Sequence, residues 1–267
     1  MRALELSVLG PLSATRDGRA LALGGPRQRA VLAVLVAAAP RTVGVDELLG
    51  QAWPPTAAPV VGTLHHYVSR LRAALEPGPP GPPAVLLRRG NGYALAVPRD
   101  AVDANRFTDS AAHGARLLAA GAPGAAAEVL GAALDLWRGD AYADAADLHA
   151  LAPVVGRLTD ARIAATEDLT DALLRTGRTA EAAGLAREST ARHPLRERGW
   201  ALLALALYRS GRQAEALSAL REVRTVLVDQ LGLDPGPGLV AAETAIRAHT
   251  APVDLTAGPR PFAAAGH

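Results

Sequence analysis

The sequence contains one internal repeat, and its period restricts the fold of the second half of the chain. LRTGRTAEA at residues 174–182 recurs as YRSGRQAEA at residues 208–216, so that Gly177 and Gly211 lie 34 residues apart. That is the period of tetratricopeptide repeats, in which each repeat is one helix–turn–helix unit. Stacked units bury a common core. We therefore expect residues 99–250 to form an all-α, tetratricopeptide-like domain, followed by a disordered tail at residues 251–267.

The first 98 residues follow a different pattern. Leu4, Leu6 and Val8 alternate with less apolar residues, and Asp17-Gly18 offers a hairpin turn into a second short strand. Three helical segments are expected next, from about residue 26 to 39, 45 to 53 and 60 to 76. A hairpin over residues 84–97 follows, with Val85 and Leu87 sharing one face of its first strand. This order is typical of an OmpR-type winged helix-turn-helix (α+β), and the chain as a whole is predicted to be mostly α.

Composition excludes several classes of site and favours a polyanionic partner for the first domain. The chain has no cysteine, so disulfides, thiolate metal sites and cysteine nucleophiles are excluded. Residues 1–98 carry 10 arginines and 5 acidic residues, whereas residues 99–267 carry 18 and 21. The longest apolar run, residues 30–39, is too short to cross a membrane, and the N-terminus does not resemble a signal peptide. We expect a cytoplasmic protein with no membrane partner.

The third predicted helix has the pattern of a helix that lies against DNA. Helical spacing puts Leu64, Val68, Leu71 and Leu75 on one buried face. From residue 60 onward, the first acidic residue is Glu76. A solvated surface helix usually mixes charges of both signs, although that interpretation stays open for this helix taken alone. Small residues beside long cations suit a helix in the major groove. The residues predicted to contact DNA from this helix are Thr63, His65, His66, Ser69, Arg70 and Arg72.

The predicted hairpin supplies a second set of DNA contacts. Its tip reads RRGNGY, and two adjacent arginines suit insertion beside or into a minor groove. The wing residues predicted to contact DNA are Arg88, Arg89, Asn91 and Tyr93. Phosphate contacts are predicted for Arg27, Gln28, Arg29 and Trp53, which lie at helix ends. Trp53 could instead be a core aromatic, and arginines often decorate a helix start.

Neither a metal nor a cofactor is expected. His65 and His66 are adjacent on a helix, so their side chains point about 100° apart and do not chelate one ion without further ligands. No nucleophile elbow, metal-ligand spacing or clustered carboxylate pair stands out, so we predict that the chain is not an enzyme.

The sequence resembles a known family over about residues 1–250. The segments PRQRAVLAVLVAAAPRTVGVDELLGQAWPP, TLHHYVSRLRAAL and RRGNGYAL are similar to the DNA-binding domain of the Streptomyces antibiotic regulatory proteins. VDANRF, ALDLWRGDAYAD, HPLRERGWALLALALYRSGRQAEAL and LGLDPGP are similar to the bacterial transcriptional activator domain that follows in that family. No GxxxxGK[ST] motif occurs, so the nucleotide-binding domain of larger relatives is not expected.

The resemblance implies a function and roles for particular residues. It implies a pathway-specific activator of a secondary-metabolite gene cluster, which binds direct repeats of double-stranded DNA, self-associates there and recruits RNA polymerase. In the broader OmpR-type domain, the positions matching Arg70 and His66 contact bases, and the position matching Thr63 lies near the DNA backbone. Arg89 matches an arginine that enters the minor groove, and Tyr93 matches the wing tyrosine. Gly62 and Ser69 stand where the broader type often has a basic residue.

Two other functions remain open from the sequence. The chain could be a helical-repeat scaffold whose first domain contacts RNA polymerase and not DNA. It could also be a ligand-gated regulator with a small molecule bound among its helices.

Overall fold

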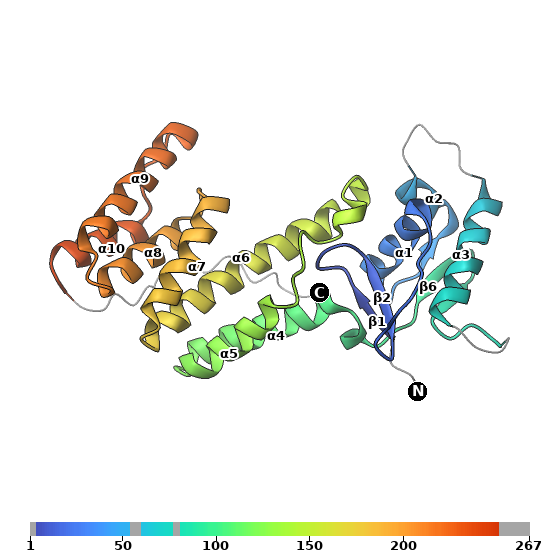
Figure 1. Cartoon of the computed structure of the whole chain (residues 1–267). Helices are drawn as coiled ribbons and strands as arrows, with labels where there is room; N and C mark the ends of the chain where they lie inside the picture. The colour runs from blue at the N-terminus through green and yellow to red at the C-terminus, as the bar shows by residue number, and fades with distance from the viewer. Residues whose placement is uncertain (1–3, 54–59, 77–80, 251–267) are drawn as a thin grey trace. The chain divides into compact units, whose positions relative to one another are not determined.

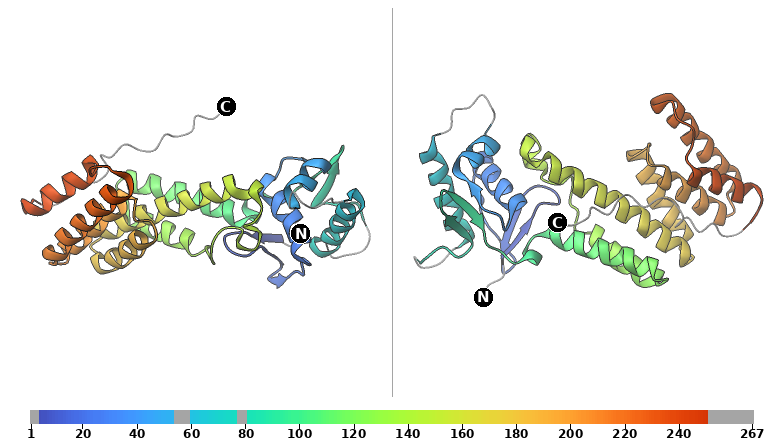
Figure 2. Two further views of the ribbon diagram at one scale, coloured as in Figure 1. Left: turned by 90° about the horizontal axis from the view of Figure 1, so that it is seen from above. Right: turned by 180° about the vertical axis from the view of Figure 1, so that it is seen from behind.

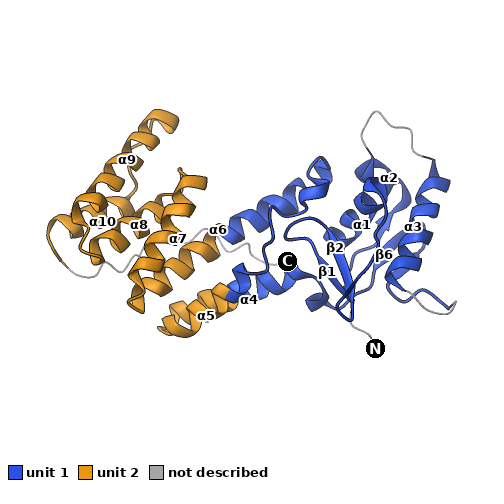
Figure 3. Ribbon diagram, viewed as in Figure 1, with its two compact units in different colours: residues 1–112, 132–162 blue, residues 113–131, 163–267 orange. Residues whose placement is uncertain are grey.

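The computed structural model describes residues 4–53, 60–76 and 81–250, and the predicted tail at residues 251–267 lies outside this range. The chain divides into two compact units (Figure 3). The first comprises residues 1–112 and 132–162, and the second comprises residues 113–131 and 163–267. No helix in the described part of the chain is long and apolar enough to cross a membrane.

A small antiparallel sheet opens the first unit. It contains β1 (Leu4–Ser7), β2 (Ser13–Arg16) and β3 (Arg19–Ala20) in the order β1-β2-β3. Asp17 and Gly18 both have left-handed φ angles, of 50° and 75°, and form the turn between β2 and β3. The turn was expected, but it joins the second strand to a third. The third strand was not predicted, because strands of four residues or fewer show too short an alternation of apolar and polar residues.

Three helices follow the sheet (Figure 1). They are α1 (Pro26–Ala38), α2 (Val45–Ala52) and α3 (Val61–Leu75). Pro26 stands at the start of α1, where its missing N–H costs nothing, and α1 buries every residue from Ala30 to Val36. The predicted buried face of α3 is confirmed, because Leu64, Val68, Leu71 and Leu75 are all buried. The apolar stripe fixes which side of α3 faces the core.

A second sheet forms the wing. It contains β4 (Val43–Gly44), β5 (Leu86–Arg89) and β6 (Gly92–Leu95) in the order β4-β6-β5. All four residues of β6 are buried, as expected for a central strand. On β5 the buried residue is Leu86, whereas Leu87 is half-buried. The strand β4, with only two residues, was also missed.

After the wing, the chain contributes helical segments to both units in turn. Its helical segments are η1 (Arg99–Ala101), α4 (Asp103–Ala119), α5 (Pro123–Leu134), η2 (Ala143–Ala145), η3 (His149–Leu151) and α6 (Ala152–Arg175). The carboxylate of Asp103 accepts hydrogen bonds from the backbone N–H groups of Val8 (2.7 Å) and Leu9 (3.2 Å). Burial raises the pKa of Asp103, although these bonds favour its ionised form.

The segment WRGDAYAD packs along the start of the chain. The N–H groups of Arg138 and Tyr142 donate to the carbonyls of Leu9 (2.7 Å) and Val8 (2.8 Å). These contacts explain why residues 132–162 lie in the first unit. The limits 1–98 and 99–250 stay predictions.

In the described residues, the second unit consists of helices joined by turns and loops. It contains the later parts of α4 and α6 and most of α5, together with α7 (Thr179–Arg192), α8 (Glu197–Arg209), α9 (Gln213–Leu231) and α10 (Pro237–Arg247) (Figure 2). Its core is built from leucine, alanine and valine around Trp200. The predicted mostly α fold, with a winged helix followed by an all-α tetratricopeptide-like domain, is confirmed.

The sequence repeat is also a geometric repeat. Gly177 and Gly211 have left-handed φ angles of 78° and 75° and end α6 and α8 in the same way. The Arg178 guanidinium pairs with Glu181, and Arg212 pairs with Glu215, each through two hydrogen bonds. Residues at equivalent positions of the two repeats therefore form equivalent turns.

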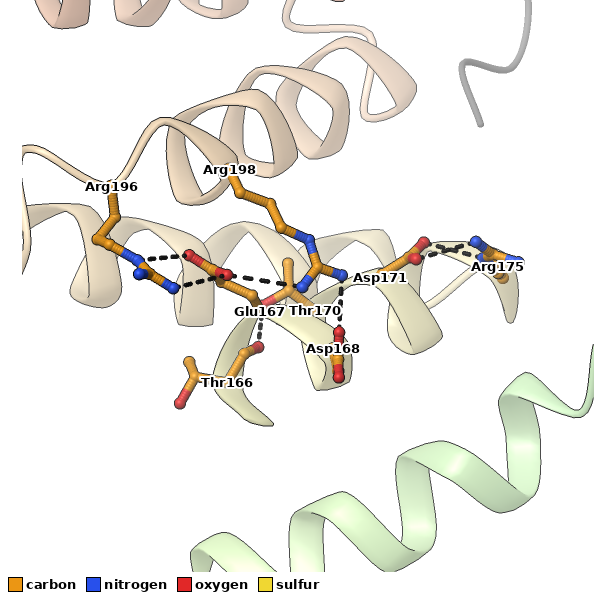
Figure 4. Close-up of polar contacts among 8 residues, drawn as sticks. All are labelled: Thr166, Glu167, Asp168, Thr170, Asp171, Arg175, Arg196 and Arg198. Carbon is orange, nitrogen blue, oxygen red and sulfur yellow. Dashed lines mark hydrogen bonds and ion pairs between the residues drawn. The ribbon is translucent and has the colours of Figure 1, made fainter. Parts of the chain in front are cut away.

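One buried carboxylate ties α6 to the start of α8. Glu167 is 2% exposed, and Arg196 Nε lies 3.4 Å from one of its oxygens (Figure 4). Arg198 lies 3.6 Å from the other oxygen and also pairs with Asp168 at 2.7 Å. Burial raises the pKa of Glu167, and the two arginines only partly offset that effect.

Candidate nucleic-acid interface

The helix α3 presents a polar face to solvent, opposite its buried leucines. This outward face is formed by Gly62, His66, Ser69, Arg70 and Ala73, all of them exposed. Thr63 lies at its edge and is half-exposed. The helix contains no acidic residue, and no atom lies within 4 Å of a Cβ placed on Gly62. The outward face is therefore small, positive and free to approach a negatively charged surface.

A second side of α3 faces the wing. The Nε of Arg72 donates to the carbonyl of Leu86 at 2.8 Å, and its guanidinium lies 5.7 Å from the centre of the Tyr93 ring. His65, about two turns earlier on the helix, has its ring 6.3 Å from that of Tyr93 in an edge-to-face arrangement. Tyr93 is only 3% exposed. Two residues predicted to contact DNA, Arg72 and His65, thus both contact the buried ring of a third, Tyr93, while His65 itself stays exposed.

The tip of the wing is exposed. Arg88, Arg89 and Asn91 all face solvent, and the tip turns at Gly90, whose φ is +55°. The carbonyl of Asn91 accepts a hydrogen bond from Val45 N–H at 2.9 Å, which ties the tip to the start of α2. The two arginines are therefore displayed on an anchored hairpin.

The four residues predicted to contact phosphate are placed unequally. Gln28 is buried, with 4% of its surface exposed. Arg29 Nε donates to the Asp144 carboxylate at 2.7 Å, and Arg29 also donates to the Leu12 carbonyl. Because Gln28 is buried and the Arg29 guanidinium binds groups of its own unit, the proposed interface does not include them.

Arg27 and Trp53 remain half-buried candidates. Arg27 donates a long hydrogen bond, 3.5 Å, to the carbonyl of Ala52. Trp53 stacks on Tyr67 of α3, with ring centres 5.9 Å apart and planes 16° apart. Trp53 therefore packs against another aromatic side chain, which was one of the two roles that the sequence left open.

Two further residues, which were not predicted from the sequence, shape this site. Tyr67 supports Trp53, and Glu76 binds the start of the wing, as described below. Glu76 carried one available signal, because it is the first acidic residue after an acid-free helix. In the described residues, no group of three or more histidine or acidic side chains is placed to hold a metal ion.

Comparisons with known proteins agree with this arrangement. Residues 18–95 match the family model described as "Transcriptional regulatory protein, C terminal", and residues 102–247 match the bacterial transcriptional activator domain. The regulatory protein DnrI of Streptomyces peucetius is 34% identical, over 91% of this chain and 92% of its own length. The chain belongs to the Streptomyces antibiotic regulatory protein family. The family resemblance seen in the sequence is thus confirmed.

Longer relatives share the same two domains. The regulatory protein AfsR of Streptomyces coelicolor is 42% identical over 89% of this chain, but over only 23% of its own length. A solved structure, Mycobacterium tuberculosis EmbR in complex with a low affinity phosphopeptide, superposes with a TM-score of 0.87 at 37% identity. That match covers 96% of this chain and 67% of the EmbR chain. This chain spans about three fifths of the curated EmbR sequence (62%).

Proposed function

We propose that this family member is a sequence-specific activator that binds double-stranded DNA through α3 and the wing. The observation that carries the proposal is the acid-free outward face of α3 beside the exposed arginines of the hairpin tip. In this proposal α3 lies in the major groove and the wing lies along the adjacent minor groove. The reaction is binding alone, with no enzymatic step and no cofactor.

The exposed side chains divide into base readers and phosphate binders. Arg70 has the length and the paired donors to bind the O6 and N7 atoms of guanine, and His66 lies one turn before it on the same face. Arg89 enters the minor groove, while Arg88 and Thr63 contact the sugar-phosphate backbone. Phosphate contacts set the affinity and its dependence on salt, and base contacts set the sequence.

The wider assignment rests on the family. The chain acts on a secondary-metabolite gene cluster in the cytoplasm, loads as two copies on direct repeats and recruits RNA polymerase through protein contacts. The tetratricopeptide-like unit is the part proposed to make those contacts, because stacked helical repeats offer extended surfaces for protein partners.

Binding of the full chain to the DNA upstream of its own gene tests the proposal. Replacing Arg70 by alanine should cost about 1–3 kcal/mol of binding free energy at the specific site and little on a random duplex. Arg221→Ala, which removes an exposed arginine from α9, is the matched control and should change neither. Mobility shifts at two salt concentrations measure both quantities.

Two outcomes contradict the proposal. If Arg70→Ala binds both duplexes like the wild type, α3 does not read bases. If the wild type binds neither duplex, the scaffold interpretation is favoured.

A further inference from the structure

The C-terminal end of α3 is bound to the first strand of the wing by one carboxylate. Glu76 follows the last residue of α3, and its own N–H donates to the carbonyl of Arg72 at 2.8 Å. Its side-chain oxygens accept hydrogen bonds from three consecutive backbone N–H groups, those of Ala84 (2.7 Å), Val85 (3.1 Å) and Leu86 (3.1 Å). A carboxylate that accepts three N–H groups holds a strand start firmly, because hydrogen bonds to charged groups are the stronger ones.

The ionisation of Glu76 fits this role. Partial burial acts to raise its pKa, but the N–H groups of Ala84, Leu86 and Val85, together with the charge of Arg72, outweigh burial and leave the pKa below its ordinary value. The carboxylate is therefore charged at neutral pH, when its hydrogen bonds are strongest.

Arg72 holds the same strand from the other side of the peptide. It donates to the carbonyl of Leu86, and the N–H of Leu86 donates to Glu76, so Arg72 and Glu76 together bind both backbone groups of this residue. Leu86 is fully buried and pairs with Leu95 of the central strand. The Arg72 guanidinium also lies over the ring of Tyr93. We call Arg72, Glu76 and the wing groups that they bind the α3–wing clamp.

We propose that Arg72 and Glu76 are positioning residues for DNA binding, which fix the wing at a set place beside the recognition helix. This inference rests on the proposed function. The clamp holds Arg88 and Arg89 in a position where they contact DNA at the same time as Arg70. Once α3 is bound, the contact of the wing with DNA is effectively intramolecular. Because the wing is already fixed in the free protein, ordering it on DNA costs no further entropy.

Charge alone predicts the opposite effect for one substitution. Glu76 is an acidic residue in a basic unit, so Glu76→Gln removes a charge that repels phosphate and should tighten binding by electrostatics. The clamp predicts weaker binding, because an amide has one acceptor oxygen and no charge for three N–H groups. The sign of the change therefore separates the two explanations.

The experiment uses the full chain and a duplex selected by the wild type from a random pool. Glu76→Gln is expected to lower affinity by about three- to tenfold. Glu5→Gln, which removes an exposed carboxylate from β1, is the matched control and should leave affinity unchanged or slightly higher. Equal tightening in both variants would overturn the inference.

A double-mutant cycle tests Arg72 separately. If Arg72 acts through the wing, Arg72→Gln should weaken binding several-fold in the wild type but have little further effect in an Arg89→Ala background. An equal loss in both backgrounds would mean that Arg72 contacts DNA itself, and it would remove Arg72 from the clamp. This cycle also decides the matter if Glu76→Gln does not fold.

Hydrogen exchange in the free protein separates the clamp from the proposed function. The amides of Val85 and Leu86 should exchange faster in Glu76→Gln than in the wild type, while the amides of α1 stay protected. Unchanged exchange at Val85 and Leu86 would overturn the clamp even if DNA binds. Faster exchange in a chain that selects no DNA would support the clamp geometry and refute its role in binding, together with the proposed function.

Discussion

Ser69 offers the sharpest test that the outward face of α3 meets DNA. It is exposed, lies next to Arg70, and stands where the broader OmpR-type domain often has a basic residue. Ser69→Arg adds one cation to this face without removing a buried contact. Arginine favours helix slightly more than serine, so the free energy of unfolding should change by less than about 0.5 kcal/mol.

The expected size of the effect follows from counterion release. Each phosphate neutralised by a cation adds about 0.9 to the slope of log affinity against log salt concentration. Between about 50 and 200 mM salt, one added contact therefore multiplies the loss of affinity by roughly threefold. Ser69→Arg should bind a random duplex more tightly at low salt and show a slope steeper by about one.

The assay is fluorescence anisotropy of a labelled random duplex over a salt series. The control is Ser218→Arg, which makes the same exchange at an exposed position within α9 of the second unit. If both variants change the slope equally, only net charge matters. If Ser69→Arg leaves affinity and slope unchanged, the outward face of α3 does not approach phosphate, and the recognition-helix assignment is refuted.

Two further predictions concern stability. Gly92→Ala would place a Cβ 2.4 Å from the carbonyl oxygen of Val43, so the free energy of unfolding, measured by thermal unfolding, should fall by about 1–3 kcal/mol. At Gly62 a Cβ would meet open space, so Gly62→Ala should raise the free energy of unfolding by up to about 1 kcal/mol. Glu167 has a pKa above its ordinary 4.5 because it is buried, so its proton stabilises the folded state. The free energy of unfolding of the wild type, compared with that of Glu167→Gln, should rise as the pH falls through the raised pKa. The rise should be complete below about pH 4.5. A difference between the two proteins that does not change with pH would contradict the stated cause.

Helical periodicity and the repeat were enough to predict much of this fold. The buried face of α3 depends only on local spacing, so Leu64 and Leu71 could be placed from the sequence. The 34-residue repeat likewise predicted the turns at Gly177 and Gly211. Strand β4 was not predictable in this way, because its two residues, Val43 and Gly44, form a strand only through pairing with β6.

The candidate site was less predictable where a side chain can face either solvent or a segment that is distant in the sequence. Sequence spacing shows that Arg70 and Arg72 lie on different sides of α3, but not that the wing covers the side of Arg72. That contact joins residues 14 positions apart, Arg72 and Leu86. Arg29 was similar, because its partner Asp144 lies 115 residues further along the chain. Long-range partners of this kind leave no local pattern.

These partners change what the charge of the first domain means. Residues 1–98 carry twice as many arginines as acids, yet several of those arginines bind groups of their own unit. Among the described residues of this domain, a backbone carbonyl or carboxylate partner is present for Arg16, Arg27, Arg29, Arg41 and Arg72. Because a guanidinium held in this way is less available to phosphate, the positive charge of the proposed interface comes mainly from Arg70, Arg88 and Arg89. One arginine added at Ser69 is then a large fraction of that charge, which is why a single substitution should produce a measurable slope.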